Sequence, residues 1–334
     1  MIRSFLARPE RIVPVVSLVL ALVVFACLPL YTDSSIHSYD IYNGLQGFAP
    51  LGLLALAIGL TMIAGEFDLS VVGVYAVGGM LAVKTGQHSA VLGIVVALAV
   101  GLAIGAFQGA LIAYLRIPSL PVTLATYIAL LGLAYALSGG LSVSYDNVGA
   151  ALWVDKNIAT VFSPRSLITI GAFVLAAVVL GGTRLGRELR AIGGDRRASR
   201  VAGVQVDRTL VGLFAVSGLL SALGGALLSY SHASANPDPG LQPLLIAAVA
   251  ALLGGTSLAG GRGNPWGLLA GGIAVATLAQ VVTSAALPDY TIQLLYAALL
   301  AVIVAIDSAG LQRGFDRLWA RRRERTITPK EELA

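Results

Sequence analysis

Two acidic residues lie between long apolar segments, where a charged side chain is costly to bury. Glu66 and Asp68 belong to the stretch GEFDLSVVGVYAVGG, residues 65–79, which joins one apolar run to the next. An ionisable group in such a place is a candidate for contact with a transported solute or ion. A structural role is the alternative, because Asp68 or Ser70 could cap a helix that starts near Val71. The sequence leaves both roles open.

A glycine-rich stretch, LLGGTSLAGGRGNPWG at residues 252–267, could approach a ligand or another backbone closely. Its six glycines prevent a simple helix and allow close packing. Glycine-rich loops can cradle phosphate, but the chain has no GxxxxGKS/T sequence, so it is not expected to hydrolyse ATP by itself. The plainer alternative is a tight re-entrant turn between two helices.

The most polar part of the middle of the chain is a basic segment, residues 184–208, with the sequence RLGRELRAIGGDRRASRVAGVQVDR. It contains seven of the 22 basic residues and three acids. Asp195 can cap a short helix, RRASRVA, which Gly203 would end. This helix would present a small apolar patch among arginines, formed by Ala198, Val201 and Ala202. The segment is either an ordinary basic loop beside a membrane or, as the patch favours, a helix that fits a groove on a partner protein.

The composition indicates an integral membrane protein around these segments. Of the 334 residues, 57% are hydrophobic and 12% are charged, against about 25% charged in a soluble domain. The single cysteine, Cys27, excludes a disulfide framework and any multi-cysteine metal site. The chain has no HExxH or GxSxG sequence and no cluster of histidines, so neither a catalytic residue nor a metal site is expected.

Ten apolar segments are long enough, or nearly long enough, to cross a bilayer. Two of them, 71–83 and 244–255, are shorter than the roughly 20 residues of a straight span. Short or broken segments often line the path of a transporter. Merging these two with their neighbours leaves eight spans as an alternative. The ten segments are approximately 12–30, 48–64, 71–83, 90–114, 121–139, 166–182, 210–230, 244–255, 266–284 and 290–306.

The positions of the basic residues predict that both chain ends are cytoplasmic. With ten spans and a cytoplasmic N-terminus, 19 basic residues fall on the inner side, as the positive-inside rule requires. Only Lys84, Lys156 and Arg165 fall on the outer side. The expected fold is therefore an all-α polytopic membrane protein with some short or broken helices.

The chain is expected to form one membrane domain with two short polar ends. Residues 1–11 would be a cytoplasmic N-terminal segment, and the apolar run after them lacks a signal-peptide cleavage site and is interpreted as a retained helix. Residues 12–306 would be the transmembrane domain, with 184–208 as a cytoplasmic loop. Residues 307–334 would be a cytoplasmic basic tail that contacts anionic lipid headgroups.

The three motif segments together resemble the ribose-type, or simple-sugar, permeases of ABC transporters, in the branched-chain amino-acid/sugar permease superfamily. GEFDLSV is similar to the family's G-I-D-L-S-V-G stretch. The basic segment resembles its T-x-x-G-R-x-x-x-A-x-G-G-N-x-x-A-A-x-x-x-G-I-x-V loop, and LLGGTSLAGGRGNPWG resembles its V-L-G-G-T-S-L-x-G-G-x-G-x-x-x-G stretch. Order and spacing agree over about residues 40–306.

The resemblance implies the permease subunit of an ATP-driven importer for a monosaccharide or related polar solute, working by alternating access. It implies three protein partners: an ABC ATPase, a periplasmic or lipid-anchored solute-binding protein, and a second permease copy or paralogue. The expected location is the cytoplasmic (inner) membrane of a prokaryote, in contact with lipid and not with nucleic acid. No cofactor is expected on this chain, because the partner ATPase would use the ATP.

The motif segments and the resemblance together assign residues to two expected sites. Those of the translocation pathway are Asn43, Gln46, Gly65, Glu66, Asp68, Ser70, Gly254, Gly255, Thr256 and Ser257. Those of the ATPase-coupling segment are Gly186, Arg187, Gly193, Gly194, Asp195, Ala198, Arg200, Ala202 and Gly203. The chain departs from the family at Glu66 and Phe67, which replace a usually apolar pair, and at Asp195, where Asn is common.

Other solutes and mechanisms stay open at this stage. Relatives within the superfamily carry nucleosides, autoinducer or branched-chain amino acids. An ion-coupled secondary transporter, with Asp68 as a ligand of the coupling ion, is less favoured because acids within the apolar segments are few. A membrane-embedded enzyme is disfavoured by the missing catalytic motifs.

Overall fold

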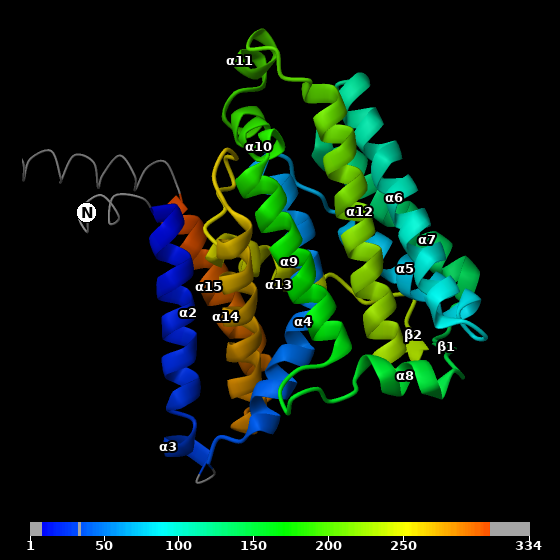
Figure 1. Ribbon diagram of the computed structural model, residues 1–334, viewed down its shortest axis with the longest axis vertical. Helices are drawn as coiled ribbons and strands as arrows, with labels where there is room; N and C mark the ends of the chain where they lie inside the picture. Colours follow the sequence, from blue (N-terminus) through cyan, green and yellow to red (C-terminus); the bar gives the residue numbers. More distant parts are fainter. Residues whose placement is uncertain (1–8, 33–34, 308–334) are drawn as a thin grey trace, which may run out of the picture.

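The computed structural model describes residues 9–32 and 35–307, and this part of the chain is almost entirely helical (Figure 1). The basic tail and most of the N-terminal segment lie outside the described residues. Two short strands, β1 (Val143–Ser144) and β2 (Ser234–Ala235), pair antiparallel. The helices are α2 (Pro9–Ala26), α3 (Pro29–Thr32), α4 (Ser38–Ile63), α5 (Val71–Thr85), α6 (Ala90–Tyr114), α7 (Ser119–Ser138), α8 (Val148–Val154), α9 (Pro164–Gly182), α10 (Arg184–Gly194), α11 (Arg196–Val201), α12 (Val206–Ser231), α13 (Gln242–Leu253), α14 (Pro265–Ser284) and α15 (Asp289–Asp307).

Nine of the ten predicted apolar segments each coincide with one helix, and the segment 12–30 covers most of α2 and the start of α3. Six helices are long and apolar enough to cross a membrane: α4, α6, α7, α9, α12 and α14. Shorter apolar helices occupy the other four segments, in α2, α5, α13 and α15. The predicted mostly helical fold, with helices long and apolar enough to cross a membrane, is thereby confirmed. The count of ten spans and the cytoplasmic placement of the chain ends stay predictions.

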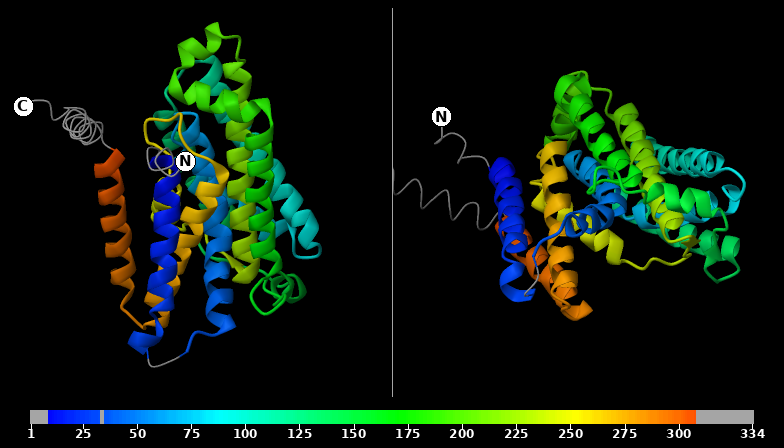
Figure 2. Two further views of the ribbon diagram at one scale, coloured as in Figure 1. Left: turned by 60° about the vertical axis from the view of Figure 1, so that its left-hand side comes forward. Right: turned by 60° about the horizontal axis from the view of Figure 1, so that its bottom comes forward.

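The helices run between two ends of the bundle that differ in character. One end, here named the α10 end, holds α10 and α11, and the described chain begins and ends on this side (Figures 1 and 2). The opposite end, here named the α8 end, holds α8, α3 and the β1–β2 pair (Figure 1). The α8 end is fixed in part by a stacked pair, Tyr145 and Tyr230, whose ring centroids lie 4.4 Å apart.

Close helix contacts hold the middle of the bundle together. Helix α4 is almost entirely buried from Phe48 to Ile63, and α12 packs closely along both α5 and α6. Small residues permit this approach, as is usual between membrane helices. At the α6–α12 crossing, a Cβ atom added to Gly218 would collide with the backbone oxygen of Gly101.

We expect Gly218→Ala to destabilise the bundle, because overpacking of a tight contact costs about 1–3 kcal/mol. The matched control is Gly212→Ala on the same helix, where an added Cβ meets nothing within 4 Å. Alanine is also the better helix former. Thermal unfolding in detergent should therefore give a lower Tm for Gly218→Ala and an equal or higher Tm for Gly212→Ala. Equal Tm values in the two variants would contradict the close-contact explanation.

Candidate functional site

The three motif segments meet at the α10 end, in a contact built from backbone. The Gly261 N–H donates a hydrogen bond to the Ile63 carbonyl, with an N–O distance of 2.9 Å. A Cβ atom on Gly193 would collide with the Ile63 oxygen and the Gly261 nitrogen, and one on Gly260 would lie 2.6 Å from the Gly65 Cα. We name Gly65, Gly193, Gly260 and Gly261 the glycine junction.

Conformation as well as space requires glycine at this junction. Gly65, Gly260 and Gly261 have φ values of +77°, +81° and +75°, a region that other residues rarely adopt. The re-entrant turn predicted for 252–267 is therefore present, and its tip rests on both other motif segments. The junction connects the end of α4 and the turn before α14 to the end of α10.

An ion pair reinforces the glycine junction. A carboxylate oxygen of Glu66 contacts the guanidinium of Arg196 on α11. The Glu66 side chain is 9% exposed and that of Arg196 is 36% exposed. A polar cavity of about 310 Å³ lies beside the pair, lined by Ala64–Glu66, Ile192–Arg196 and Ala259. Sequence reasoning missed Arg196, although an acid in place of an apolar residue at position 66 required a cationic partner nearby.

The basic segment folds as two helices, α10 and α11, where the sequence predicted one. The predicted cap is confirmed: Asp195 Oδ1 accepts hydrogen bonds from the N–H groups of Arg197 at 2.8 Å and Ala198 at 3.0 Å. The predicted stop is also confirmed, since Gly203 follows α11 with a φ of +82°. Helix α10 includes the glycine pair Gly193–Gly194 at its end.

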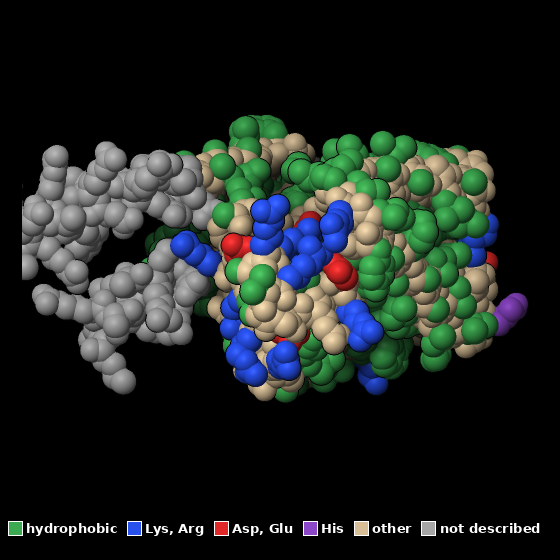
Figure 3. All heavy atoms as spheres, turned by 90° about the horizontal axis from the view of Figure 1, so that it is seen from above, with side chains coloured by type: hydrophobic (Ala, Val, Ile, Leu, Met, Phe, Trp, Pro, Cys, Tyr) green, Lys and Arg blue, Asp and Glu red, His purple; other side chains and the backbone are tan. Residues whose placement is uncertain are grey.

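The outer face of α11 carries the predicted apolar patch. Ala198 and Ala202 are exposed, and Val201 is 91% exposed. Arg200 forms an ion pair with Asp207 at 2.6 Å beside this patch. Figure 3, viewed from the α10 end, shows Lys and Arg side chains gathered around this part of the surface.

The remaining coupling candidates lie between the patch and the bundle. Gly186 fills the corner between α9 and α10, where a Cβ would collide with the Leu180 oxygen. Arg187 lines a second cavity, of about 230 Å³, together with Arg184, Glu188, Ala191 and Val204. These positions connect the exposed helix to the span that precedes it.

Asp68 lies deeper in the bundle and is fully buried. Its Oδ1 accepts from the Ser70 N–H at 3.0 Å and the Ser70 hydroxyl at 2.6 Å. Its Oδ2 accepts from the Ser217 hydroxyl at 2.8 Å and from Gln108 Nε2 at 3.4 Å. The carboxylate thus joins the start of α5 to α6 and α12. This geometry favours the structural role, and a role for Asp68 in the pathway stays a prediction.

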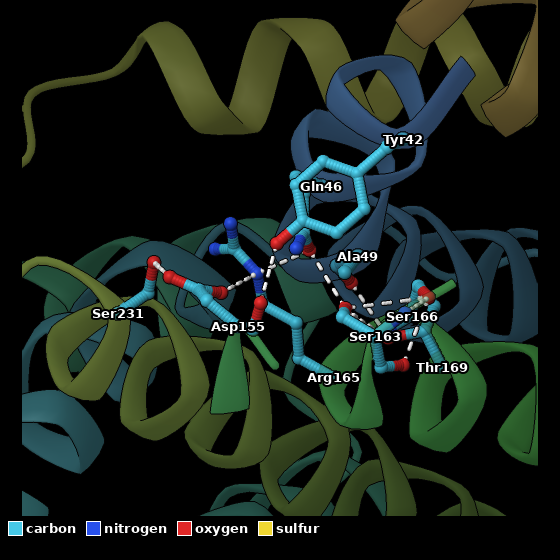
Figure 4. Close-up of polar contacts among 9 residues, drawn as sticks. All are labelled: Tyr42, Gln46, Ala49, Asp155, Ser163, Arg165, Ser166, Thr169 and Ser231. Carbon is cyan, nitrogen blue, oxygen red and sulfur yellow. Dashed lines mark hydrogen bonds and ion pairs between the residues drawn. The ribbon is translucent and has the colours of Figure 1, made fainter. Parts of the chain in front are cut away.

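The predicted pathway residues do not form one site. Gly65 and Glu66 lie at the glycine junction, and Thr256 and Ser257 are buried in the turn after α13. Asn43 and Gln46 lie instead at the α8 end, where Gln46 belongs to a polar cluster with Arg165 and Asp155 (Figure 4).

One titratable group stands close to this cluster, at the end of α12. Burial and, to a lesser extent, the nearby Arg165 guanidinium lower the pKa of His232. The imidazole is therefore neutral near pH 7 and adds no charge to the cluster.

Comparison with known proteins identifies the family of the chain that carries these sites. The model of the family described as the branched-chain amino acid transport system / permease component matches residues 41–304. The chain belongs to this family. It is thus a membrane permease component, as the three motifs predicted. No solved structure matches it significantly.

Several curated relatives are similar over most of their length. The xylose transport system permease of Escherichia coli is 28% identical, covering 84% of this chain and 88% of the relative. The ribose import permease of the same organism is also 28% identical, covering 87% and 92%. Its L-arabinose transport system permease is 31% identical, covering 77% and 80%.

The Glu66–Arg196 pair gives a direct test of the junction. Glu66→Arg or Arg196→Glu alone leaves a largely buried charge beside a like charge, at a cost that we put at about 2 kcal/mol because Arg196 is partly exposed. The double swap restores opposite charges and should recover part of the lost Tm. Arg197→Glu is the control, because its exposed side chain lies on the same helix. Additive losses in the double variant would show that the pair is not coupled.

Proposed function

We propose that this chain is the transmembrane permease subunit of an ATP-driven ABC importer for a monosaccharide or a related polar solute. The xylose, ribose and L-arabinose permeases among its relatives support this solute class. The observation that carries the mechanism is the glycine junction, which links an exposed docking helix to the bundle through backbone contacts.

The partners follow from the surfaces of the chain and from the family. A cytoplasmic ATPase dimer would contact the exposed patch on α11 and would hydrolyse the ATP, so that this chain needs no cofactor of its own. A periplasmic or lipid-anchored solute-binding protein would deliver the solute at the α8 end. A second permease copy or a paralogue would complete the transporter in the inner membrane of a prokaryote, with the α10 end in the cytoplasm.

In the proposed mechanism, a displacement of α11 is transmitted to the helices of the bundle. When the ATPase dimer closes, it displaces α10 and α11. Since the glycine junction has no side chains to deform, the displacement passes to the end of α4 and to the turn before α14. These elements flank α5 and α13, the short helices near the path. Their movement would alternate access between the two ends.

The proposed function is tested by uptake into proteoliposomes. We expect the permease, reconstituted with its ATPase and its loaded binding protein, to accumulate radiolabelled xylose, ribose or L-arabinose only when ATP is present. Liposomes without the ATPase are the control. Uptake that continues without the ATPase would contradict the proposal and favour an ion-coupled transporter.

The docking surface is tested by Ala202→Trp, which adds bulk to the exposed patch without disturbing a buried contact. Gly203 is less suitable, because its positive φ would strain any replacement. We expect ATP-dependent uptake and the amount of copurified ATPase to fall more than about tenfold, as for the loss of an interface hot spot. Gln205→Trp, at an exposed position beyond the patch, is the control. Normal copurification and uptake in Ala202→Trp would exclude this patch as the ATPase contact.

A further inference from the structure

A buried polar cluster at the α8 end joins three parts of the chain. Gln46 belongs to α4, Arg165 to the first turn of α9, and Asp155 to the segment between α8 and α9 (Figure 4). Arg165 Nε donates to Gln46 Oε1 at 2.6 Å, and the Ser163 hydroxyl donates to the same oxygen at 2.8 Å. Arg165 is 7% exposed and Gln46 is 8% exposed. Charged and amide groups this deeply buried are expected to use their hydrogen-bonding capacity.

Gln46 uses only half of that capacity. The orientation of its amide is fixed, because Arg165 Nε is solely a donor and must face the oxygen. The amide nitrogen, Nε2, is then left buried with no hydrogen-bond partner among the described residues. Leaving such a donor unpaired costs about 1–3 kcal/mol, so the position of Nε2 requires an explanation beyond the contact between α4 and α9.

Arg165 leaves further donors unused. Both of its contacts involve Nε, one with Gln46 and one with Asp155 Oδ1 at 2.7 Å. The N–H groups of its two terminal nitrogens have no partner among the described residues. In Figure 4 these nitrogens lie on the side of the guanidinium away from Ser163. The cluster therefore contains two neighbouring groups, an amide and a guanidinium, that offer donors and lack acceptors.

The charge of the cluster indicates whether an anionic or a neutral ligand would supply acceptors for these donors. Asp155 balances the charge of Arg165, and its Oδ2 accepts from the Ser231 hydroxyl at 2.6 Å. An anionic ligand would meet the Asp155 carboxylate, whose Oδ1, apart from its ion pair with Arg165, is buried with no hydrogen-bond partner among the described residues. The hydroxyl groups of a neutral ligand can accept from the unused donors and can also donate to this oxygen. The ring of Tyr42, whose hydroxyl donates to the Asp155 carbonyl at 2.5 Å, borders the cluster and offers an apolar face (Figure 4).

We propose that Gln46 and Arg165 form a sugar-binding subsite at the α8 end of the transport path. Adjacent hydroxyl oxygens of a neutral sugar would accept hydrogen bonds from Gln46 Nε2 and from the terminal nitrogens of Arg165. Helix α4 and the start of α9 converge on these donors, so the sugar would reach them when the two elements separate. This inference rests on the proposed function and deepens it, because it gives the permease its own recognition of hydroxyl groups.

Gln46→Glu separates this role from a purely structural one. Glutamate keeps an oxygen for Arg165 and Ser163, so the contact between α4 and α9 is retained, but it removes the Nε2 donor. Thr169→Val is the matched control, because it deletes a 2.8 Å hydrogen bond from α9 to the Ala49 carbonyl of α4 and leaves the donors intact.

The measurement is the maximal uptake rate by the complete reconstituted transporter. The probes are the transported pentose and its single-deoxy analogues, each at a concentration that saturates the binding protein. Under saturation, the affinity of the binding protein no longer affects the ratio of the two rates. We expect the wild-type transporter and Thr169→Val to take up the unmodified pentose about tenfold faster than at least one deoxy analogue. A rate ratio of this size corresponds to the free energy of one hydrogen bond. In Gln46→Glu this ratio should approach one, with an unchanged or higher Tm.

The possible outcomes separate the inference from the proposed function. An equal ratio in wild type and Gln46→Glu, with pentose uptake intact, would overturn the subsite and leave the proposed function standing. Preference for a sugar acid over the neutral sugar in wild type would overturn the neutral-ligand assignment. Absence of ATP-dependent uptake of any sugar in wild type would overturn the proposed function and the subsite together.

Discussion

The structure depends on one constraint, the backbone contact at the α10 end that tolerates no Cβ atom. Ile63, Gly193 and Gly261 approach so closely that a hydrogen bond joins the end of α4 to the re-entrant turn. A contact between side chains can adjust when the rotamers change. This contact is formed by backbone atoms, so the segments can move apart only if the contact is lost. Helix α11, the pair between Glu66 and Arg196, and the polar cavity beside them all lie around this point. The segments that could transmit force are therefore joined where the chain is least deformable.

Buried charged side chains lie at three places in the bundle, and their hydrogen-bond partners differ from one place to the next. At the α10 end, Glu66 meets a partly exposed arginine on a surface helix, so its pairing depends on the position of that helix. Deeper inside, Asp68 is surrounded by protein donors and holds three helices together. At the α8 end, Arg165 is paired with Asp155 but keeps unused donors. Among the described residues, the buried side-chain atoms without a hydrogen-bond partner are Gln108 Oε1 beside Asp68, and Gln46 Nε2 and Asp155 Oδ1 at the α8 end. Of these three atoms only Gln46 Nε2 is a donor, so it is the α8 end that could pair with an external acceptor.

The sequence predicted what depends on local pattern and failed where distant residues meet. Apolar runs located the ten helices, and Asp195 and Gly203 marked the ends of α11, because capping and span length are local properties. The contact of Gln46 with Arg165 joins positions 119 residues apart, and no periodicity signals it. The position of Glu66 between two apolar segments placed it among the predicted pathway residues. Its contact with Arg196 of α11 now supports a place beside the coupling segment.

The two ends of α4 are held by different kinds of contact. This difference determines at which end α4 can separate from its neighbours while the rest of the bundle stays packed. At the α10 end, backbone meets backbone, so α4, α10 and the turn before α14 move together if they move at all. At the α8 end, α4 meets α9 through side chains, including Gln46, Ser163 and Thr169. Such contacts can exchange one acceptor for another at little net cost, because a hydroxyl-rich ligand replaces the bonds that are lost. Under the proposed function, a force applied at α11 would therefore reach α4 through the backbone contact at the α10 end. The resulting movement would occur at the α8 end, where polar contacts can be remade around a solute.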